Sequence, residues 1–277
     1  MEKTTIKILV ATHKPGIIHQ DNIYSPIQVG KKISPYNLEN ILGDNTGDNI
    51  SEKNPMYCEL TALYWAWKNL KDVDYIGLCH YRRYFDFHQQ TNSYLPITVK
   101  PTTIMSSFNF SLPKEIIDEL KKGAIILPKK LVLKESVYKH YCKQHVSKDM
   151  QTLQTVVKEL SDSQTTDAFN HLMKQNKFAP YNMFIMSWKD FTEYCTWMFS
   201  ILKAVEEQTD LSTYDPIQKR IYGYMSERLL NVYIDAQQKK TINVPVVQFI
   251  DNTNIKNQSY LEYTLKTFIK NISSKLP

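Results

Sequence analysis

The chain has 277 residues, 42% of them hydrophobic, and its 34 basic and 28 acidic residues give a formal charge of +6. This length and composition suit one large globular domain with a sizeable core, and the intermixed charges do not indicate a nucleic-acid partner. No apolar run approaches the roughly 20 residues of a membrane-spanning helix, and no signal peptide pattern begins the chain, so we expect a cytoplasmic protein.

Hydrophobic periodicity and turn residues predict alternating strands and helices in the first half of the chain. A β-rich run at 6–11 forms the first strand, and the Pro-, Gly-, Asn- and Asp-rich stretch 21–50 is expected to be mostly loop. A helix follows to residue 70, with Asn54 and Pro55 in N-cap and N1 positions. It leads into a buried strand that ends at His80, after which residues 86–112 look irregular.

The second half continues this alternation and completes an α/β pattern. Helices are predicted at 114–122, 136–144, 150–160, 168–175 and 188–205, and from Asp215-Pro216 to about 237; strands are predicted at 124–127, 181–186 and 242–249. Strands separated by helices favour an α/β sheet over a helix bundle or a β-sandwich. The sequence therefore predicts one central sheet flanked by helices.

The strand that ends at His80 runs directly into a cationic, aromatic cluster that contains Arg82 and Arg83. Ligands of an open parallel sheet bind beyond the carboxyl ends of its strands, so two guanidiniums and an imidazole here indicate an anion site, most naturally for a diphosphate. Adjacent arginines on an extended backbone point to opposite sides, and only a turn would let both reach one ligand. The alternative is a solvated basic pair.

Five segments of the chain resemble, in order, the bacterial capsular-polysaccharide and O-antigen glycosyltransferases, a family long catalogued as a domain of unknown function. They are THKP at 12–15, DNISEKN at 48–54, ELTALYWAWKN at 59–69, GLCHYRRYF at 77–85 and GYMSERLL at 223–230. The resemblance covers nearly the whole chain and is most specific in its N-terminal half. Residues from about 89 to 179 carry little signature.

This resemblance implies a GT-A-like nucleotide-sugar transferase of the inverting type. One domain would span 1–257, with a donor-binding half at about 1–127 and an acceptor and catalytic half at about 128–257. The implied reaction transfers a hexosyl residue, galactofuranose or galactose, from a UDP-sugar to a growing capsular or O-antigen polysaccharide intermediate. A non-catalytic nucleotide- or carbohydrate-binding protein on the same fold is the alternative.

GT-A enzymes commonly hold a divalent metal such as Mn²⁺ through an Asp-x-Asp motif at the end of a central strand. This chain has Cys79-His80-Tyr81-Arg82 at that place. Metal binding needs several convergent ligands, and no closely spaced group of carboxylates and histidines stands there. We therefore expect no metal cofactor, and expect cations of the protein to replace it.

The resemblance also implies which residues hold the UDP-sugar donor, and most of them have a structural alternative. The implied donor-binding residues are Thr12, His13, Lys14, Asn49, Ser51, Asn54, His80, Arg82 and Arg83. The first three would face the nucleobase and ribose, although a plain turn at Pro15-Gly16 explains them equally. The next three would bind hydroxyl groups, although capping and loop hydrogen bonds are nearly as common a role for such residues.

Glu227 is the implied catalytic residue, as the general base that deprotonates the acceptor hydroxyl. Most glutamates in such helical positions are solvated surface residues, which is the alternative. Asp215 and Asp190 are weaker rivals for the same role. Asn182 and Arg228 are expected to contact the acceptor or the donor sugar.

Residues 258–277 form a separate C-terminal segment, predicted as an amphipathic helix with apolar residues set against lysines. Such a helix either lies on an anionic lipid surface or packs against the domain, and packing is the commoner role. The first reading would place the protein peripherally on the inner face of the cell membrane. A lipid-linked saccharide acceptor is the expectation that goes with it.

Overall fold

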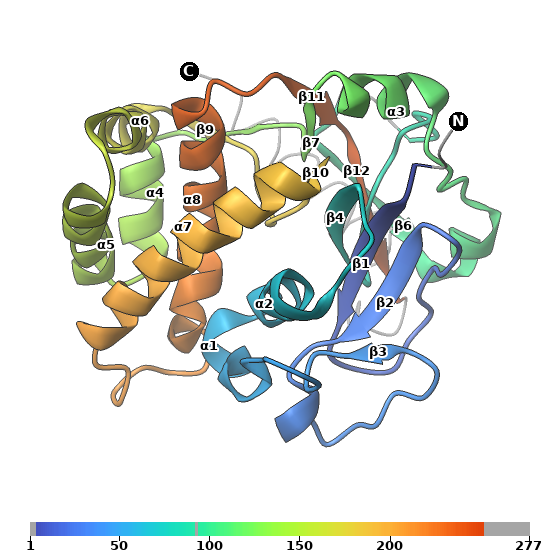
Figure 1. Ribbon diagram of the computed structural model, residues 1–277, viewed down its shortest axis with the longest axis horizontal. Helices are drawn as coiled ribbons and strands as arrows, with labels where there is room; N and C mark the ends of the chain where they lie inside the picture. The colour runs from blue at the N-terminus through green and yellow to red at the C-terminus, as the bar shows by residue number, and fades with distance from the viewer. Residues whose placement is uncertain (1–3, 92–93, 252–277) are drawn as a thin grey trace.

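The structure of the chain is a computed structural model that describes residues 4–91 and 94–251 (Figure 1). Its central element is a sheet with strand order β11-β7-β10-β4-β1-β2-β3, flanked by helices on both faces. This is the mostly parallel α/β architecture that the sequence predicts. The amphipathic helix predicted at 258–277 lies outside the described residues.

The parallel part of the sheet is built on β1 (Ile6–Thr12). It pairs in parallel with β2 (Tyr24–Gln28) on one side and with β4 (Tyr75–His80) on the other, and β3 (Leu42–Gly43) extends the sheet beyond β2. The register sets Ala11 opposite His80. The carboxyl ends of β1 and β4 therefore lie side by side.

The remaining strands come from later in the chain. β10 (Phe184–Ser187) is antiparallel to both β4 and β7 (Ile125–Pro128), and β11 (Thr241–Val244) runs parallel to β7. β12 (Val246–Ile250) pairs with β5 (Arg83–Phe85) and β6 (Ile97–Pro101), and β8 (Leu131–Val132) pairs with β9 (Lys177–Phe178) in a separate ribbon. Strands from both expected halves of the domain thus share one sheet.

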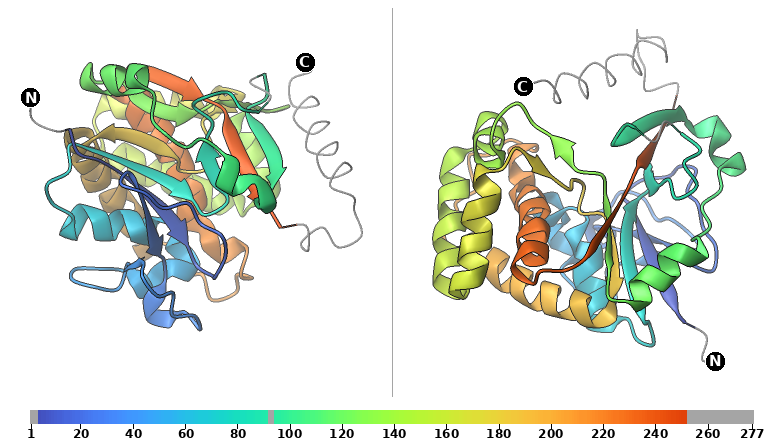
Figure 2. Two further views of the ribbon diagram at one scale, coloured as in Figure 1. Left: turned by 90° about the vertical axis from the view of Figure 1, so that its right-hand side faces the viewer. Right: turned by 90° about the horizontal axis from the view of Figure 1, so that it is seen from above.

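Two hydrophobic clusters cover the two faces of the sheet. Leu9 and Ala11 face the larger one, whereas Ile8 and Val10 face the smaller one, as the alternation of a strand requires. The larger cluster contains buried residues of α2 (Leu60–Asn69), α7 (Trp188–Glu207) and α8 (Ile221–Ala236). It also contains residues of α4 (Val137–Gln144), α5 (Ser147–Leu160) and α6 (Ser163–Lys174), which lie farther from the sheet (Figure 2). α3 (Lys114–Lys121) packs on the opposite face.

Two stretches predicted as irregular contain strands. β2 lies within 21–50, where turn-forming residues conceal it, and it tolerates Pro26 because β3 pairs only with Ile27 and Gln28 of it. β6 lies within 86–112 and is followed by the 3-10 helix η3 (Thr102–Ser107). Two further 3-10 helices in these regions are η1 (Lys31–Ile33) and η2 (Ser51–Lys53).

Several predicted boundaries were also wrong. The helix expected through 57–70 is broken at Cys58, whose φ of 52° ends α1 (Asn54–Tyr57), and Asn54 is the first residue of α1 and not its cap. The strand expected from Tyr181 begins at Phe184, because Tyr181 and Asn182 both have positive φ. α8 begins after the 3-10 helix η4 (Gln218–Arg220), and Pro245 divides the last predicted strand into β11 and β12.

Among the described residues, no helix combines the length and the apolar character that crossing a membrane would need.

Gly77 sits at the centre of β4, where neighbouring strands leave no room for a side chain. A Cβ atom there would lie 2.7 Å from the backbone oxygen of Phe184 and 2.9 Å from Ile185 Cγ1. We expect Gly77→Ala to lower the free energy of unfolding by about 1–3 kcal/mol, because a backbone atom must move. Urea denaturation measures this. Gly16→Ala, with nothing within 4 Å, is the control, and equal stability of the two variants would contradict the packing argument.

Candidate active site

A cleft opens at the carboxyl ends of β1 and β4. Its volume is about 690 Å³, and it continues into an inner recess of about 90 Å³. The cleft is lined by Ala11, His13, Val29, Asn54, Pro55, Cys58, Glu59, His80, Tyr81, Arg82, Arg83, Pro216, Lys219, Arg220 and Gln248. The recess is lined by Cys58, Glu59, His80, Arg83, Tyr181, Arg220, Gly223, Tyr224 and Glu227.

The β4–β5 hairpin brings both adjacent arginines to this cleft. β4 ends at His80, the chain turns at Tyr81 and Arg82, and Arg83 pairs with His80 across the hairpin. Because the chain turns here, the side chains of Arg82 and Arg83 do not have to point to opposite sides. Arg82 Nη2 lies 3.2 Å from Asp251 Oδ2, and Arg83 Nε donates to Gln248 Oε1 at 3.2 Å.

The arginines of the chain are concentrated at this one place. The sequence has only four, and three of them, Arg82, Arg83 and Arg220, line the cleft. The fourth, Arg228, is buried directly behind the recess against Glu227. Lys219 adds a further cation to the lining. Such a wall is suited to a multiply charged anion, because guanidinium groups form two parallel hydrogen bonds to phosphate oxygens.

The two histidines of the cleft are held neutral by their surroundings. Burial lowers the pKa of His80, and Arg83 and Arg220 lower it further against the opposing effect of Glu59. Burial and the nearby Lys14, Arg220 and Arg82 also lower the pKa of His13. His80 Nε2 lies 2.6 Å from the carbonyl oxygen of Tyr181. Because a carbonyl only accepts, Nε2 carries the ring proton and Nδ1 is an acceptor.

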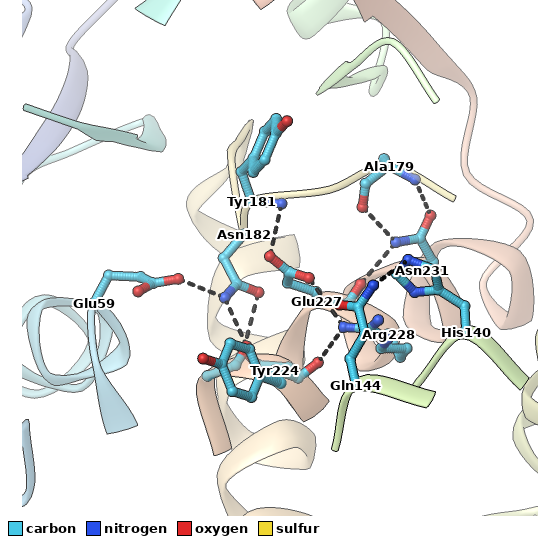
Figure 3. A network of polar contacts seen from close by, with 12 residues as sticks. Glu59, His140, Gln144, Ala179, Tyr181, Asn182, Tyr224, Glu227, Arg228 and Asn231 are labelled. Carbon is cyan, nitrogen blue, oxygen red and sulfur yellow. Dashed lines mark hydrogen bonds and ion pairs between the residues drawn. The ribbon is translucent and has the colours of Figure 1, made fainter. Parts of the chain in front are cut away.

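Glu227 projects from α8 into the recess and is paired on its far side (Figure 3). Its Oε1 accepts from the backbone N–H of Tyr181 at 3.1 Å, and Arg228 Nη1 lies 3.0 Å from its Oε2. Its side chain is 21% exposed, whereas that of Arg228 is 3% exposed. Burial raises the pKa of Glu227, Arg228 counteracts this, and Glu59 adds to it. Glu227 is thus a partly buried carboxylate and not a solvated surface residue.

Asn182 links the segment before β10 to two other elements. Its side-chain NH₂ donates to Glu59 Oε1 at 2.7 Å and to the carbonyl oxygen of Gly223 at 3.1 Å. Its Oδ1 accepts from Ser226 Oγ at 2.9 Å, and Figure 3 shows this network beside Glu227. Asn182 is only 2% exposed. Its amide positions Glu59 and does not itself line the cleft.

Not all of the sequence-predicted residues come together at the cleft. His13, Asn54, His80, Arg82 and Arg83 line it, and Glu227 lines the recess. Arg228, predicted to contact sugar, instead donates to the carbonyl oxygen of Tyr224 and packs against the rings of Tyr141 and Phe178.

Four residues assigned to the donor have local structural roles instead. Thr12 is fully buried and donates to the carbonyl oxygen of Lys14, and Lys14 lies over the ring of Tyr81 beside the cleft. Asn49 closes a turn onto Gly47. Ser51 is buried and donates to Asp44.

The rival carboxylates are also occupied elsewhere. Asp190 is buried at the start of α7, where it accepts from Ser187 and pairs with Lys239. Asp215 accepts from the backbone N–H groups of Ile217 and Gln218 before η4. Neither lines the cleft or the recess, so the structure gives more support to Glu227 than to either of them.

Sequence reasoning missed several lining residues, above all Glu59 and Arg220. Glu59 begins one of the five segments that resemble the family, at 59–69, but no role in the site was predicted for it. The break at Cys58 directs it into both the cleft and the recess. Arg220 lies 162 positions from Cys58, to whose Sγ it donates. The rarity of arginine in this chain is the one signal that pointed to it.

The donor set at the end of β4 does not fit a divalent metal. The carboxylates that face the site are Glu59 and Glu227, and both lie among arginines that would repel a cation. In the part of the chain that the structure describes, no three His, Cys, Asp or Glu residues are grouped so that they could hold a metal ion.

Comparison with known proteins places the chain in a family. The model described as "Domain of unknown function (DUF4422)" matches residues 7–239. The chain belongs to this family. No curated protein matches it significantly. Among solved structures it is similar to the apo structure of the WbbM bifunctional glycosyltransferase, with 32% sequence identity and a TM-score of 0.80. The match covers 90% of this chain but only 46% of that one.

The buried pair of Arg228 and Glu227 makes a prediction about stability. Arg228→Met leaves a partly buried carboxylate without its cation, and we expect it to lower the free energy of unfolding by about 3–5 kcal/mol. Urea denaturation at neutral pH measures the loss. The control is Lys32→Met, which breaks a solvent-exposed pair with Glu52 and should change stability little. If Arg228→Met is as stable as the control, the pair does not hold Glu227 in place.

Proposed function

We propose that the protein is a glycosyltransferase that takes its sugar from a UDP-sugar. The observation that carries this is the joining of a cation-lined cleft to a recess with a carboxylate at its far side. The cleft offers His13, Arg82, Arg83 and Arg220 to a diphosphate. The similarity to the WbbM bifunctional glycosyltransferase supports the class of reaction, and the DUF4422 match agrees with it.

In the proposed reaction, the acceptor hydroxyl oxygen attacks the anomeric carbon of the sugar in line with the departing group. The new C–O bond forms as the bond from that carbon to the β-phosphate oxygen breaks, and its electron pair leaves with UDP. Glu227 takes the hydroxyl proton. The arginines stabilise the negative charge that develops on the diphosphate. This course inverts the configuration at the anomeric carbon.

The finer assignments rest on the sequence resemblance. The proposed donor sugar is galactofuranose or galactose, and the proposed acceptor is a lipid-linked capsular or O-antigen intermediate. The chain spans less than half of the bifunctional protein that it matches, so these assignments concern the transfer step of this chain alone. Cations of the protein take the place of a metal in the proposal.

Removing Arg82 or Arg83 should weaken UDP binding, because each donates charged hydrogen bonds to the diphosphate. Arg82→Ala and Arg83→Ala should each cost at least ~1.5 kcal/mol of binding free energy, which is about tenfold in Kd. Isothermal titration with UDP in the presence of EDTA measures this, and the wild type should bind equally well when Mn²⁺ replaces the chelator.

Lys158→Ala, on the exposed face of α5, is the control for charge removal and should bind UDP as the wild type does. Wild-type affinity in both arginine variants would end the diphosphate role. Binding that appears only after Mn²⁺ is added would overturn the metal-free form of the proposal.

Glu227→Gln keeps the size and polarity of the side chain but removes its basicity. We expect kcat to fall by roughly a hundredfold while UDP affinity stays near that of the wild type. A base must be ionised to act, and burial holds the pKa of Glu227 above the usual 4.5. The wild-type kcat should therefore rise with pH around a midpoint above 4.5, and the variant should lose this acid limb.

The exposed Glu159 of α5 provides the control, since Glu159→Gln should retain both kcat and its pH profile. Unchanged turnover in Glu227→Gln, together with a lower free energy of unfolding, would show that Glu227 only pairs with Arg228.

A further inference from the structure

Among the described residues, Glu59 is the one with a carboxylate that faces both parts of the site. It lines the cleft together with the cations, and it also lines the recess together with Glu227. Glu227 lines only the recess, whereas His13 and Arg82 line only the cleft. Glu59 therefore lies at the junction between the place suited to a diphosphate and the place of the proposed base.

An in-line displacement sets the order of groups along this path. The leaving diphosphate and the attacking hydroxyl must lie on opposite sides of the anomeric carbon, so the transferred sugar must lie between the cations and Glu227. The recess is much the smaller of the two spaces, at about 90 Å³ against about 690 Å³ for the cleft. We therefore place the sugar ring in the cleft, at the mouth of the recess and beside Glu59.

The junction offers acceptors as well as donors, because Glu59 and His80 line both spaces together with Arg83 and Arg220. Asn182 donates to Glu59 Oε1, and among the described residues no hydrogen bond is made to Oε2. His80, which lines both spaces, donates through Nε2 to Tyr181 and so has Nδ1 as an acceptor. Sugar hydroxyl groups are donors, and a carboxylate accepts from them more strongly than a neutral group does. The chemistry of the junction therefore suits hydroxyls of a sugar.

We infer that Glu59, held by Asn182, binds hydroxyl groups of the transferred sugar and thereby selects the donor. This inference rests on the proposed function, because it assigns a role within the same site. Glu59 contacts the sugar and not the UDP, whereas Glu227 contacts the attacking hydroxyl. Asn182 acts through Glu59 and is a positioning residue.

Glu59→Gln separates these roles, because the amide retains the shape of the side chain but loses its charge. With UDP alone as the probe, isothermal titration should give an affinity within about twofold of the wild type. With UDP-galactofuranose and UDP-galactose as donors, kcat/KM for the preferred one should fall at least tenfold, mainly through KM, and the preference between the two should shrink. The acid limb of kcat should remain. Glu59→Asp, which retracts the charge by one methylene, should change KM in the same direction.

Glu52→Gln is the matched control, since Glu52 lies on η2 in the same segment but is exposed and faces Lys32. Unchanged KM and donor preference in Glu59→Gln would overturn the inference, as would loss of the acid limb of kcat in this variant but not in Glu227→Gln. Failure of the proposed function would look different, because the wild type itself would then neither bind UDP nor turn over either donor. In that case the inference falls with it.

Discussion

The amide of Asn182 joins three of the segments that line the recess, and the position of the Glu59 carboxylate depends on it. One side chain contacts Glu59 at the start of α2 and both Gly223 and Ser226 on α8. A buried amide must find partners for its donors and its acceptor, and all three of these bonds are made within the protein. The backbone of Asn182 has a φ of 52°, which asparagine tolerates better than most residues.

One face of α8 lies against the segment 179–182, and this is why the amide of Asn182 can reach the helix. Gly223, Glu227 and Asn231 recur every four residues, so they lie one above another on a single face of the helix. Each contacts the segment 179–182: Gly223 accepts from Asn182, Glu227 accepts from Tyr181, and Asn231 exchanges two hydrogen bonds with Ala179. Gly223 also lets Cys58 approach, because a Cβ atom there would lie 3.1 Å from Cys58 Sγ.

The charges around Glu227 satisfy two opposing requirements of the proposed base, a raised pKa and an ionised carboxylate. A base must be poorly solvated to keep a raised pKa, yet an isolated buried carboxylate would simply take up a proton. Arg228, which lies behind the recess, meets both requirements, because it lowers the pKa of Glu227 that burial and Glu59 raise. Arg82, Arg83 and Arg220 lie on the open side, where an anionic ligand can reach them. All four arginines of the chain are thus divided between the lining of the cleft and one structural pair.

The sequence predicted the fold class and most helices, because the apolar periodicity of a long segment is recognisable whatever its local detail. It also predicted that His80, Arg82 and Arg83 come together at the end of β4, and all three line the cleft there. The carboxyl end of such a strand is where α/β sheets bind ligands. It failed for β2, whose Pro26 and flanking turn residues resemble a loop. There the strand is set by pairing with β1, which a local pattern does not contain.

Two motif-based assignments, Asn49 and Ser51, lie outside the cleft, where the motif shapes a loop. Ser51 lies within a segment that resembles the family, but its hydroxyl serves Asp44, whose carboxylate also accepts from the backbone N–H groups of Gly30 and Lys31. Asn49 closes its own turn. Polar residues in such a loop satisfy backbone groups that would otherwise lack partners, and a sequence alone does not separate this role from ligand binding.

The role of Tyr181 was not predicted from the sequence, for a different reason. Tyr181 gives its backbone N–H to Glu227 and its carbonyl oxygen to His80, so one residue joins the proposed base to the end of β4. Its side chain places a ring beneath the guanidinium of Arg83, which lies 4.7 Å from the ring centroid. Backbone groups are the same in every residue except proline, so they leave no signature in the sequence. The site is thus recognised from its arginines and carboxylates but assembled by a peptide unit that any of many residues could supply.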